Sequence, residues 1–76
     1  MDRKEEVLRR FGLRMAELRQ EKGLSTGTLA AVTGLREDLL DRIEEGKVDV
    51  MFTTILIIAH GLGVSPEELL DTLPDV

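Results

Sequence analysis

Residues 23–43 read GLSTGTLAAVTGLREDLLDRI, and this stretch decides the fold. Ser25 can cap the N-terminus of a short helix that runs from Thr26 to about Val32. Thr33-Gly34-Leu35 is typical of a tight turn, and a further helix is expected from about Arg36 to Glu45. The stretch therefore predicts two short helices joined by a short turn.

A longer helix is predicted upstream, from about Arg3 to Lys22, and Gly23 ends it as a glycine just past a helix does. Its apolar residues recur at spacings of three and four, which places them on one face. Gly12 costs this helix roughly 1 kcal/mol relative to Ala, so we expect it to permit the close approach of another helix. The residues on the apolar face are Val7, Leu8, Phe11, Met15 and Leu18.

Two more helices are predicted downstream. One runs from Phe52 to Leu62 and is closed by Gly61 or Gly63. The other begins at Ser65-Pro66-Glu67-Glu68, which is a full capping box with proline at the first helical position, and Pro74 ends it. The side chains expected to face the core from the helix at 36–45 and from this last helix are Leu39 or Leu40, Ile43, Leu69, Leu70 and Leu73.

The composition bounds the fold class and excludes some chemistry. A chain of 76 residues fits one domain, residues 1–76. With 42% hydrophobic residues but only two Phe and no Trp or Tyr, the core must be built from aliphatic side chains and Met, which favours an all-α fold. The absence of Cys excludes disulfides, thiol metal sites and thiol catalysis.

Neither a secretory signal nor a membrane helix is predicted. The charged residues at 2–6 leave no room for the apolar region that a secretory signal requires at its start. The longest apolar-rich run, Val50–Ala59, is interrupted by Thr53 and Thr54 and is about half the length that spans a bilayer. We therefore expect a cytoplasmic protein that buries this run against other protein surface.

The net charge of −5 weighs against nucleic-acid binding, because neutralisation of phosphates by Lys and Arg supplies most nonspecific affinity. The distribution of charge reduces this objection. All basic residues lie between Arg3 and Lys47, whereas the segment after Lys47 carries acidic residues and no Lys or Arg.

An ordered set of residues resembles a known family. The matching pattern is Arg19-x-x-x-Gly23-Leu24-Ser25-x-x-x-Leu29-Ala30-x-x-x-Gly34-Leu35, then Ile43-Glu44-x-Gly46, then Ile58-Ala59-x-x-Leu62-Gly63-Val64-Ser65. It resembles the phage-repressor (Cro/cI-like) and xenobiotic-response-element family of helix-turn-helix transcriptional regulators, over about residues 11–70. The resemblance implies a compact five-helix, lambda-repressor-like domain whose second and third helices form the helix-turn-helix.

Four of the matched residues are assigned structural roles. Ala30 is small where the second helix crosses the third, and Gly34 can take the positive φ that reverses the chain. The resemblance implies that Arg19, late in the first helix, pairs with Glu44 at the end of the third. Two separate surface charges are the alternative.

The resemblance also implies a DNA-facing surface, with the third helix in the major groove. Glu37, Asp38 and Arg42 would occupy base-reading positions with Asp41 nearby, and Thr26 would meet a phosphate. The positive charges available for phosphates are Arg14, Arg36, Arg42 and Lys47, with Arg9, Arg10 and Lys22 as further candidates.

This sequence departs from the family at several of these positions. Relatives commonly have Gln at the position of Thr26 and Ser at that of Arg36, and they commonly read bases with Gln, Arg, Ser or Thr. Glu37 and Asp38 are acceptors only, so they can accept from the cytosine amino group but are repelled by flanking phosphates. A cytosine-containing site is the specific prediction. The alternative is that both acids favour the positive end of the third helix, on a domain whose DNA contact has weakened or vanished.

Self-association is predicted because one copy has few basic residues that could bind phosphates. A two-fold dimer would read two half-sites of palindromic double-stranded DNA, one helical turn apart. Ile57 occupies a position that is generally polar in relatives, and Val50 lies seven residues earlier, on roughly the same helical face. Both are candidates for the subunit contact. The alternative is that the last helix or the chain end covers them.

The sequence gives no support to an enzyme or to a cofactor site. It has one His, no glycine-rich phosphate loop, and no evident pairing of an acid with a base. His60 lies where the family has a variable solvent-side residue, so a catalytic or metal role is not expected. The competing hypothesis is a protein-interaction module of the same fold, or an antitoxin, that has lost DNA affinity.

Overall fold

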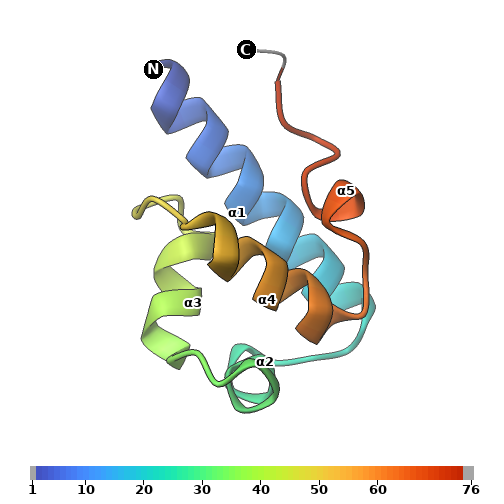
Figure 1. Ribbon diagram of the computed structural model, residues 1–76. Helices are drawn as coiled ribbons and strands as arrows, with labels where there is room; N and C mark the ends of the chain where they lie inside the picture. Colours follow the sequence, from blue (N-terminus) through green and yellow to red (C-terminus); the bar gives the residue numbers. More distant parts are fainter. Residues whose placement is uncertain (1, 75–76) are drawn as a thin grey trace.

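A computed structural model of the chain describes residues 2–74, and these residues form five helices and no strand (Figure 1). The all-α fold is confirmed, as are two short helices on either side of Gly34. The helices are α1 (Arg3–Glu21), α2 (Thr26–Thr33), α3 (Glu37–Glu44), α4 (Phe52–Leu62) and α5 (Pro66–Leu69).

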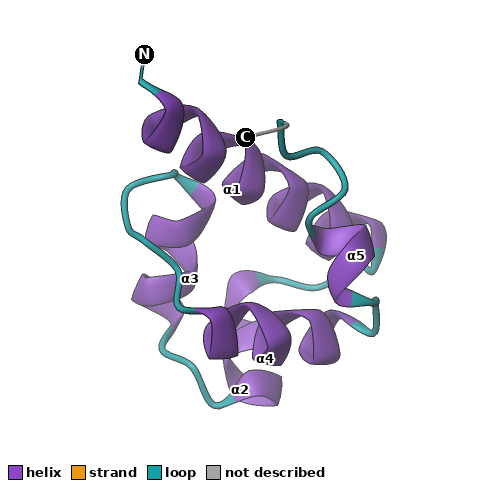
Figure 2. Cartoon of the chain, turned by 45° about the horizontal axis from the view of Figure 1, so that its top comes forward, coloured by secondary structure: helices purple, strands orange, loops and turns teal. Residues whose placement is uncertain are grey.

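The long helix α1 is flanked by α3 on one side and α5 on the other (Figures 1 and 2). Helix α2 contacts α3 and α4, and α4 also contacts α5, so the four shorter helices complete a shell around one core. Within the described residues, no helix is long and apolar enough to cross a membrane.

Three helices begin with the side-chain caps that their sequences favour. The Asp2 carboxylate accepts from Glu5 N at 2.7 Å, and Ser25 Oγ accepts from Thr28 N at 3.0 Å. In the predicted capping box, Ser65 Oγ accepts from Glu68 N and Glu68 Oε1 accepts from Ser65 N, both at 3.2 Å. These contacts satisfy N–H groups that have no partner within the helix.

The turn between α2 and α3 is fixed by two adjacent residues. Gly34 has φ +76°, a left-handed conformation that only glycine adopts cheaply. The Thr33 hydroxyl donates to Leu29 O at 2.7 Å and accepts from Leu35 N at 3.2 Å. The angle between the two helices is therefore set by local hydrogen bonds as well as by packing.

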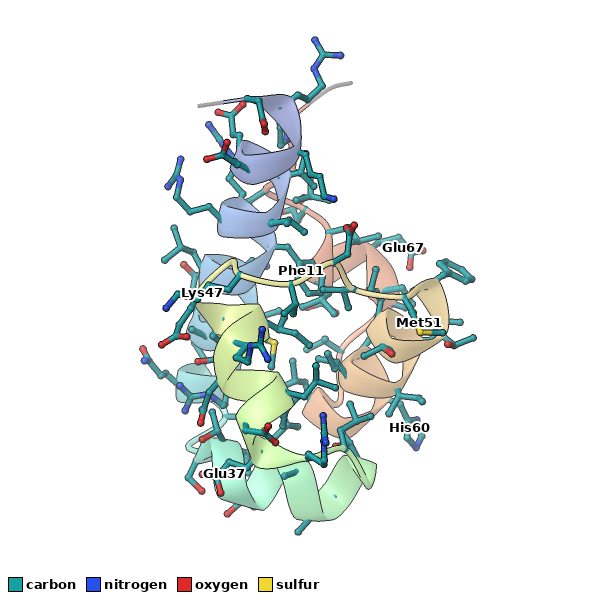
Figure 3. The ribbon with its side chains drawn as sticks, turned by 90° about the vertical axis from the view of Figure 1, so that its left-hand side faces the viewer. Phe11, Glu37, Lys47, Met51, His60 and Glu67 are labelled. Carbon is teal, nitrogen blue, oxygen red and sulfur yellow. The ribbon has the colours of Figure 1, made fainter. Side chains whose placement is uncertain are left out.

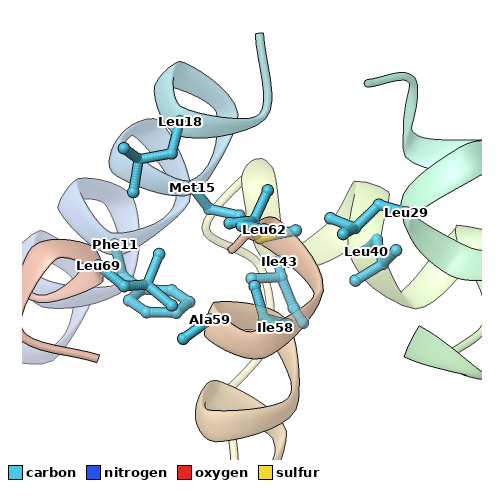
Figure 4. Packing of buried hydrophobic residues seen from close by; sticks show 10 residues of the cluster. All are labelled: Phe11, Met15, Leu18, Leu29, Leu40, Ile43, Ile58, Ala59, Leu62 and Leu69. Carbon is cyan, nitrogen blue, oxygen red and sulfur yellow. The ribbon is translucent and has the colours of Figure 1, made fainter. Parts of the chain in front are cut away.

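The core is entirely apolar, and among residues 2–74 no buried side chain is polar or charged. Leu40 is fully buried and Leu39 only partly, which settles the choice that the sequence left open. The core residues meet between the helices in Figure 4: Phe11, Met15, Leu18, Leu29, Leu40, Ile43, Ile58, Ala59, Leu62 and Leu69.

The last helix is shorter than predicted. α5 ends at Leu69, whereas the sequence suggested a helix that continues to Pro74. The Glu68 carbonyl accepts from Arg14 Nε at 2.9 Å, and the next backbone bonds span only three residues, so the chain turns instead of continuing the helix. Leu70 and Leu73 still pack against the core, but from outside the helix.

Candidate nucleic-acid interface

Helix α3 is held against α1 by direct contact of the two backbones at Gly12. A Cβ atom on Gly12 would lie 2.5 Å from both Ile43 O and Glu44 O. Real side-chain carbons do not approach carbonyl oxygens so closely, so any other residue would push the helices apart. The expected role of Gly12 as a close-approach residue is confirmed.

The end of α3 is fixed by a paired charge. Arg19 Nε lies 2.7 Å from Glu44 Oε2 and Arg19 Nη2 lies 3.0 Å from Glu44 Oε1, so the ion pair is bidentate. Arg19 Nη1 also donates to Leu24 O at 2.8 Å, which ties the loop before α2 to the same group. The side chains are only 14% and 13% exposed. The predicted pair is present, and it links α1, the loop before α2, and α3.

The hydrogen bond to Glu44 raises the pKa of Arg19 above its ordinary value, and the nearby Glu44 and Asp41 charges add to this effect against partial burial. A raised pKa on a base means that its stabilising contribution is fully present below the unfolded-state pKa and is lost as the pH rises through the folded-state pKa. Arg19 is therefore charged throughout the physiological pH range. The position of α3 against α1 does not depend on the titration of Arg19.

With its inner side fixed in this way, α3 exposes a polar outer side. The residues on it that the sequence predicted to meet DNA are all exposed, together with Lys47 in the loop that follows: Arg36, Glu37, Asp38, Asp41 and Arg42. In Figure 3, Glu37 and Lys47 mark opposite ends of α3. Arg36 Nε lies 3.7 Å from Asp38 Oδ1, and Lys47 Nζ lies 3.7 Å from Glu45 Oε1. These surface pairs are weak and leave the cations free to exchange partners.

Two predicted site residues have contacts that the sequence did not reveal. Thr26 Oγ1 donates to Glu37 Oε2 at 3.2 Å, so two residues that were each predicted to contact DNA contact each other. No local pattern signals this bond, because it joins the first residues of two separate helices.

Arg14 is not brought to the α3 side. Its side chain lies on the α5 side of α1, where it binds Glu68 O and forms an ion pair with Glu17. Because α3 and α5 lie on opposite sides of α1, Arg14 helps to fix the end of α5, and the phosphate contact predicted for it would lie away from α3.

A second exposed surface is apolar and lies on α4 and the end of α2. Met51 and Phe52 are 71% and 69% exposed, and Ile57 is 41% exposed. A groove of about 240 Å³ separates the two helices and is lined by Val32, Thr33, Leu56, Ile57, His60 and Gly61. We call this surface, Val32, Met51, Phe52, Leu56 and Ile57, the apolar face.

Val50 does not belong to the apolar face. Helix α4 begins at Phe52, so Val50 lies in the preceding loop, where it is half-buried and packs against the core. The premise that it shares a helical face with Ile57 is wrong.

Gly63, with φ +72°, is the residue that ends α4, and Gly61 lies next to Thr33 and Leu29 of α2. No cluster of His, Cys, Asp or Glu within residues 2–74 could hold a metal ion.

Comparison with known proteins agrees with this geometry. The helix-turn-helix domain family matches residues 10–73 of the chain. The chain belongs to this family of DNA-binding transcriptional regulators. An uncharacterised HTH-type transcriptional regulator of Sinorhizobium fredii, y4dJ, is 36% identical over 58 residues, which cover 76% of this chain and 75% of that protein.

Solved structures of regulators share the fold. The restriction-modification controller protein C.AhdI from Aeromonas hydrophila is 42% identical, with a TM-score of 0.80 over 82% of this chain and 94% of that one. An HTH_3 family transcriptional regulator from Vibrio cholerae is 26% identical, with a TM-score of 0.85 over 90% of this chain and 38% of that one. The phage-repressor-like resemblance of the sequence is confirmed.

Proposed function

We propose that this chain is a non-enzymatic, sequence-specific regulator that binds a palindromic DNA operator as a homodimer, with α3 in the major groove. The observation that carries the proposal is the construction of α3. Its inner side is fixed to α1 by Gly12 and by the Arg19–Glu44 pair, while its outer side presents only exposed polar residues. A rigid helix with a free polar side is what major-groove recognition requires.

The proposed contacts follow from side-chain chemistry. Arg36 and Lys47 lie at the two ends of α3 and are suited to phosphates, while Arg42 can reach either a phosphate or a guanine edge. Asp38 and Asp41 can only accept hydrogen bonds, so they favour the amino group of cytosine. The proposed operator therefore contains cytosine in each half-site.

The apolar face supports the dimer. Side chains as large as Phe52 and Met51 are rarely exposed together on a monomer unless they meet a partner. A second copy related by two-fold symmetry would cover this face and place a second α3 one helical turn away along the DNA, about 34 Å. It would also double the number of phosphate contacts made by one complex.

The experiment that tests the proposal is selection from random duplex DNA at low salt, followed by a salt titration of the enriched sequence by fluorescence anisotropy. We expect a palindrome with cytosine in each half-site. Three phosphate contacts per copy predict a slope of log affinity against log salt of about −5 for the dimer. Failure to enrich any sequence, with no binding at low salt, would overturn the proposal.

A protein-interaction or antitoxin module is the second candidate, favoured by the acidic side chains on α3 and by the apolar face. A complex formed through the apolar face would keep its affinity as salt rises, whereas a DNA complex would lose it steeply. The salt titration therefore separates the two candidates.

A further inference from the structure

Glu37 is the first residue of α3, and its carboxylate lies against the first turn of α2. Glu37 Oε2 accepts from Thr26 Oγ1 at 3.2 Å. Both carboxylate oxygens lie 3.5 Å from the position that a Cβ atom would have on Gly27. Glu37 therefore bridges the starts of the two helices of the helix-turn-helix.

The charge at this corner has a local function. The first turn of α2 contains no acidic residue of its own, so Glu37 supplies the negative charge that an exposed helix start favours. Because Glu37 is itself the first residue of α3, one carboxylate serves both helix starts. A Cβ atom on Gly27 would be in ordinary van der Waals contact with the carboxylate, so the carboxylate lies directly against the first turn of α2.

The same contact bears on DNA binding. The hydroxyl donor of Thr26 is engaged by Glu37, so it is not free for a phosphate. A fixed carboxylate at this corner also repels any phosphate that approaches it, whatever the base sequence. Both effects act on the DNA backbone and neither distinguishes one base from another.

We infer that Glu37 is a positioning residue that holds Thr26 and lowers affinity for all DNA sequences equally, and that it does not read a base. The inference rests on the proposed function, and it leaves base reading to Asp38, Asp41 and Arg42. It replaces the expectation from the sequence that Glu37 accepts from cytosine. It also assigns an effect to a negatively charged side chain on a surface that meets negatively charged DNA, which is to lower the affinity.

The decisive variant is Glu37→Gln, which keeps a carbonyl acceptor for Thr26 and removes only the charge. We expect it to raise affinity for the selected duplex and for a random duplex by the same factor, about fivefold at low salt, with the gain shrinking as salt increases. A fresh selection with this variant should return the same bases. The charge-matched control is Glu67→Gln on α5, which Figure 3 shows well away from Glu37 and which should change affinity less than twofold.

Thr26→Val provides a second measurement, since it removes the hydroxyl and keeps the side-chain shape. It should leave affinity for both duplexes nearly unchanged, whereas a phosphate-binding Thr26 would make affinity fall. Thermal unfolding of each variant checks that the fold is retained.

The outcomes separate this inference from the proposed function. If Glu37→Gln weakened binding of the selected duplex alone, or if its own selection returned a different base, Glu37 would be a base reader and the inference would be wrong while the proposed function stood. Binding by Glu37→Gln but not by the unmodified chain would support the inference and overturn the proposed function. Absence of binding by both proteins would overturn both.

Discussion

Helices α3 and α4 are both half-buried, yet their outer sides have opposite chemistry. The inner sides contribute Leu40 and Ile43 from α3, and Ile58 and Ala59 from α4, to the same core. The outer side of α3 is charged, whereas that of α4 is part of the apolar face. The inner sides therefore specify one fold, and the outer sides specify two different partners, DNA for α3 and a second copy for α4 in our proposal.

The two helices also differ in how they are held. α3 contacts the α1 backbone through Gly12, and α4 contacts α2 side chains through Gly61, where a Cβ would lie 2.5 Å from Thr33 Cγ2 and 3.2 Å from Leu29 Cδ1. A side chain can rotate away from an added methyl group, but a helix backbone cannot do so without moving the helix. The position of the DNA-facing helix is therefore the less adjustable of the two.

The largest effect is expected from Gly12→Ala, which tests how α3 is held. The added methyl group clashes with two carbonyl oxygens, and we expect a loss of about 3 kcal/mol in the free energy of unfolding, even after the better helix propensity of Ala. Thermal and urea unfolding followed by circular dichroism would measure it. The matched variant Gly61→Ala should cost less, because its two nearest contacts are side-chain methyl groups and not backbone carbonyl oxygens. An equal or larger loss for Gly61→Ala would contradict the contrast between α3 and α4.

The next effect is expected from Arg19→Ala. It leaves Glu44 largely buried without its partner and frees Leu24 O, so the free energy of unfolding should fall by about 2 kcal/mol. Arg19→Lys should recover only part of the loss, since a single ammonium cannot reproduce the bidentate geometry.

The control for Arg19 is Lys4→Ala, which removes the exposed ion pair of Lys4 with Asp49 at 2.9 Å. The hydrogen bond to Asp49 and its charge raise the pKa of Lys4, so any contribution is present at neutral pH, yet the melting temperature should barely move because both side chains are exposed. Equal melting temperatures for the Arg19 and Lys4 variants would show that burial does not matter here.

These contrasts also explain what the sequence could predict. Helix starts at Ser25 and Ser65 were predictable because a cap depends on residues three positions apart. The Arg19–Glu44 pair came from family resemblance, since nothing local connects two residues 25 positions apart.

What the sequence could not predict includes contacts with partners that are distant in the sequence. Arg14 looked like a surface cation, but it binds the Glu68 carbonyl and so helps to end α5 early. Glu37 is predicted from the sequence to read a base, and its hydrogen bond with Thr26 of the other helix is the contact on which our inference of a different role rests. The seven-residue spacing places Val50 and Ile57 on one helical face only if the helix includes both, and α4 begins after Val50.

Ile57→Asp tests the outer side of α4. A charge on the apolar face should raise the dimer dissociation constant about 30-fold, which is about 2 kcal/mol. The monomer should stay folded, because the Ile57 side chain is already 41% exposed in it. Light scattering over a concentration series would measure it. Leu13→Asp is the matched control, since Leu13 is an equally large exposed residue on α1, 56% exposed and outside the apolar face. A monomeric unmodified chain at high concentration would refute the dimer.

Arg42→Ala tests the outer side of α3, and its effect is the smallest of the four. We expect affinity for the selected duplex to fall about tenfold. A phosphate-binding Arg42 makes the salt slope less steep by about one unit for each copy when it is removed, whereas a base-reading Arg42 leaves the slope unchanged and its loss relaxes the base preference. Unfolding should be unchanged, since Arg42 is exposed. The matched control is Arg10→Ala on α1, which binds Thr72 O and Glu6. If both substitutions weakened binding equally, the charge of the whole protein, rather than α3, would govern DNA affinity.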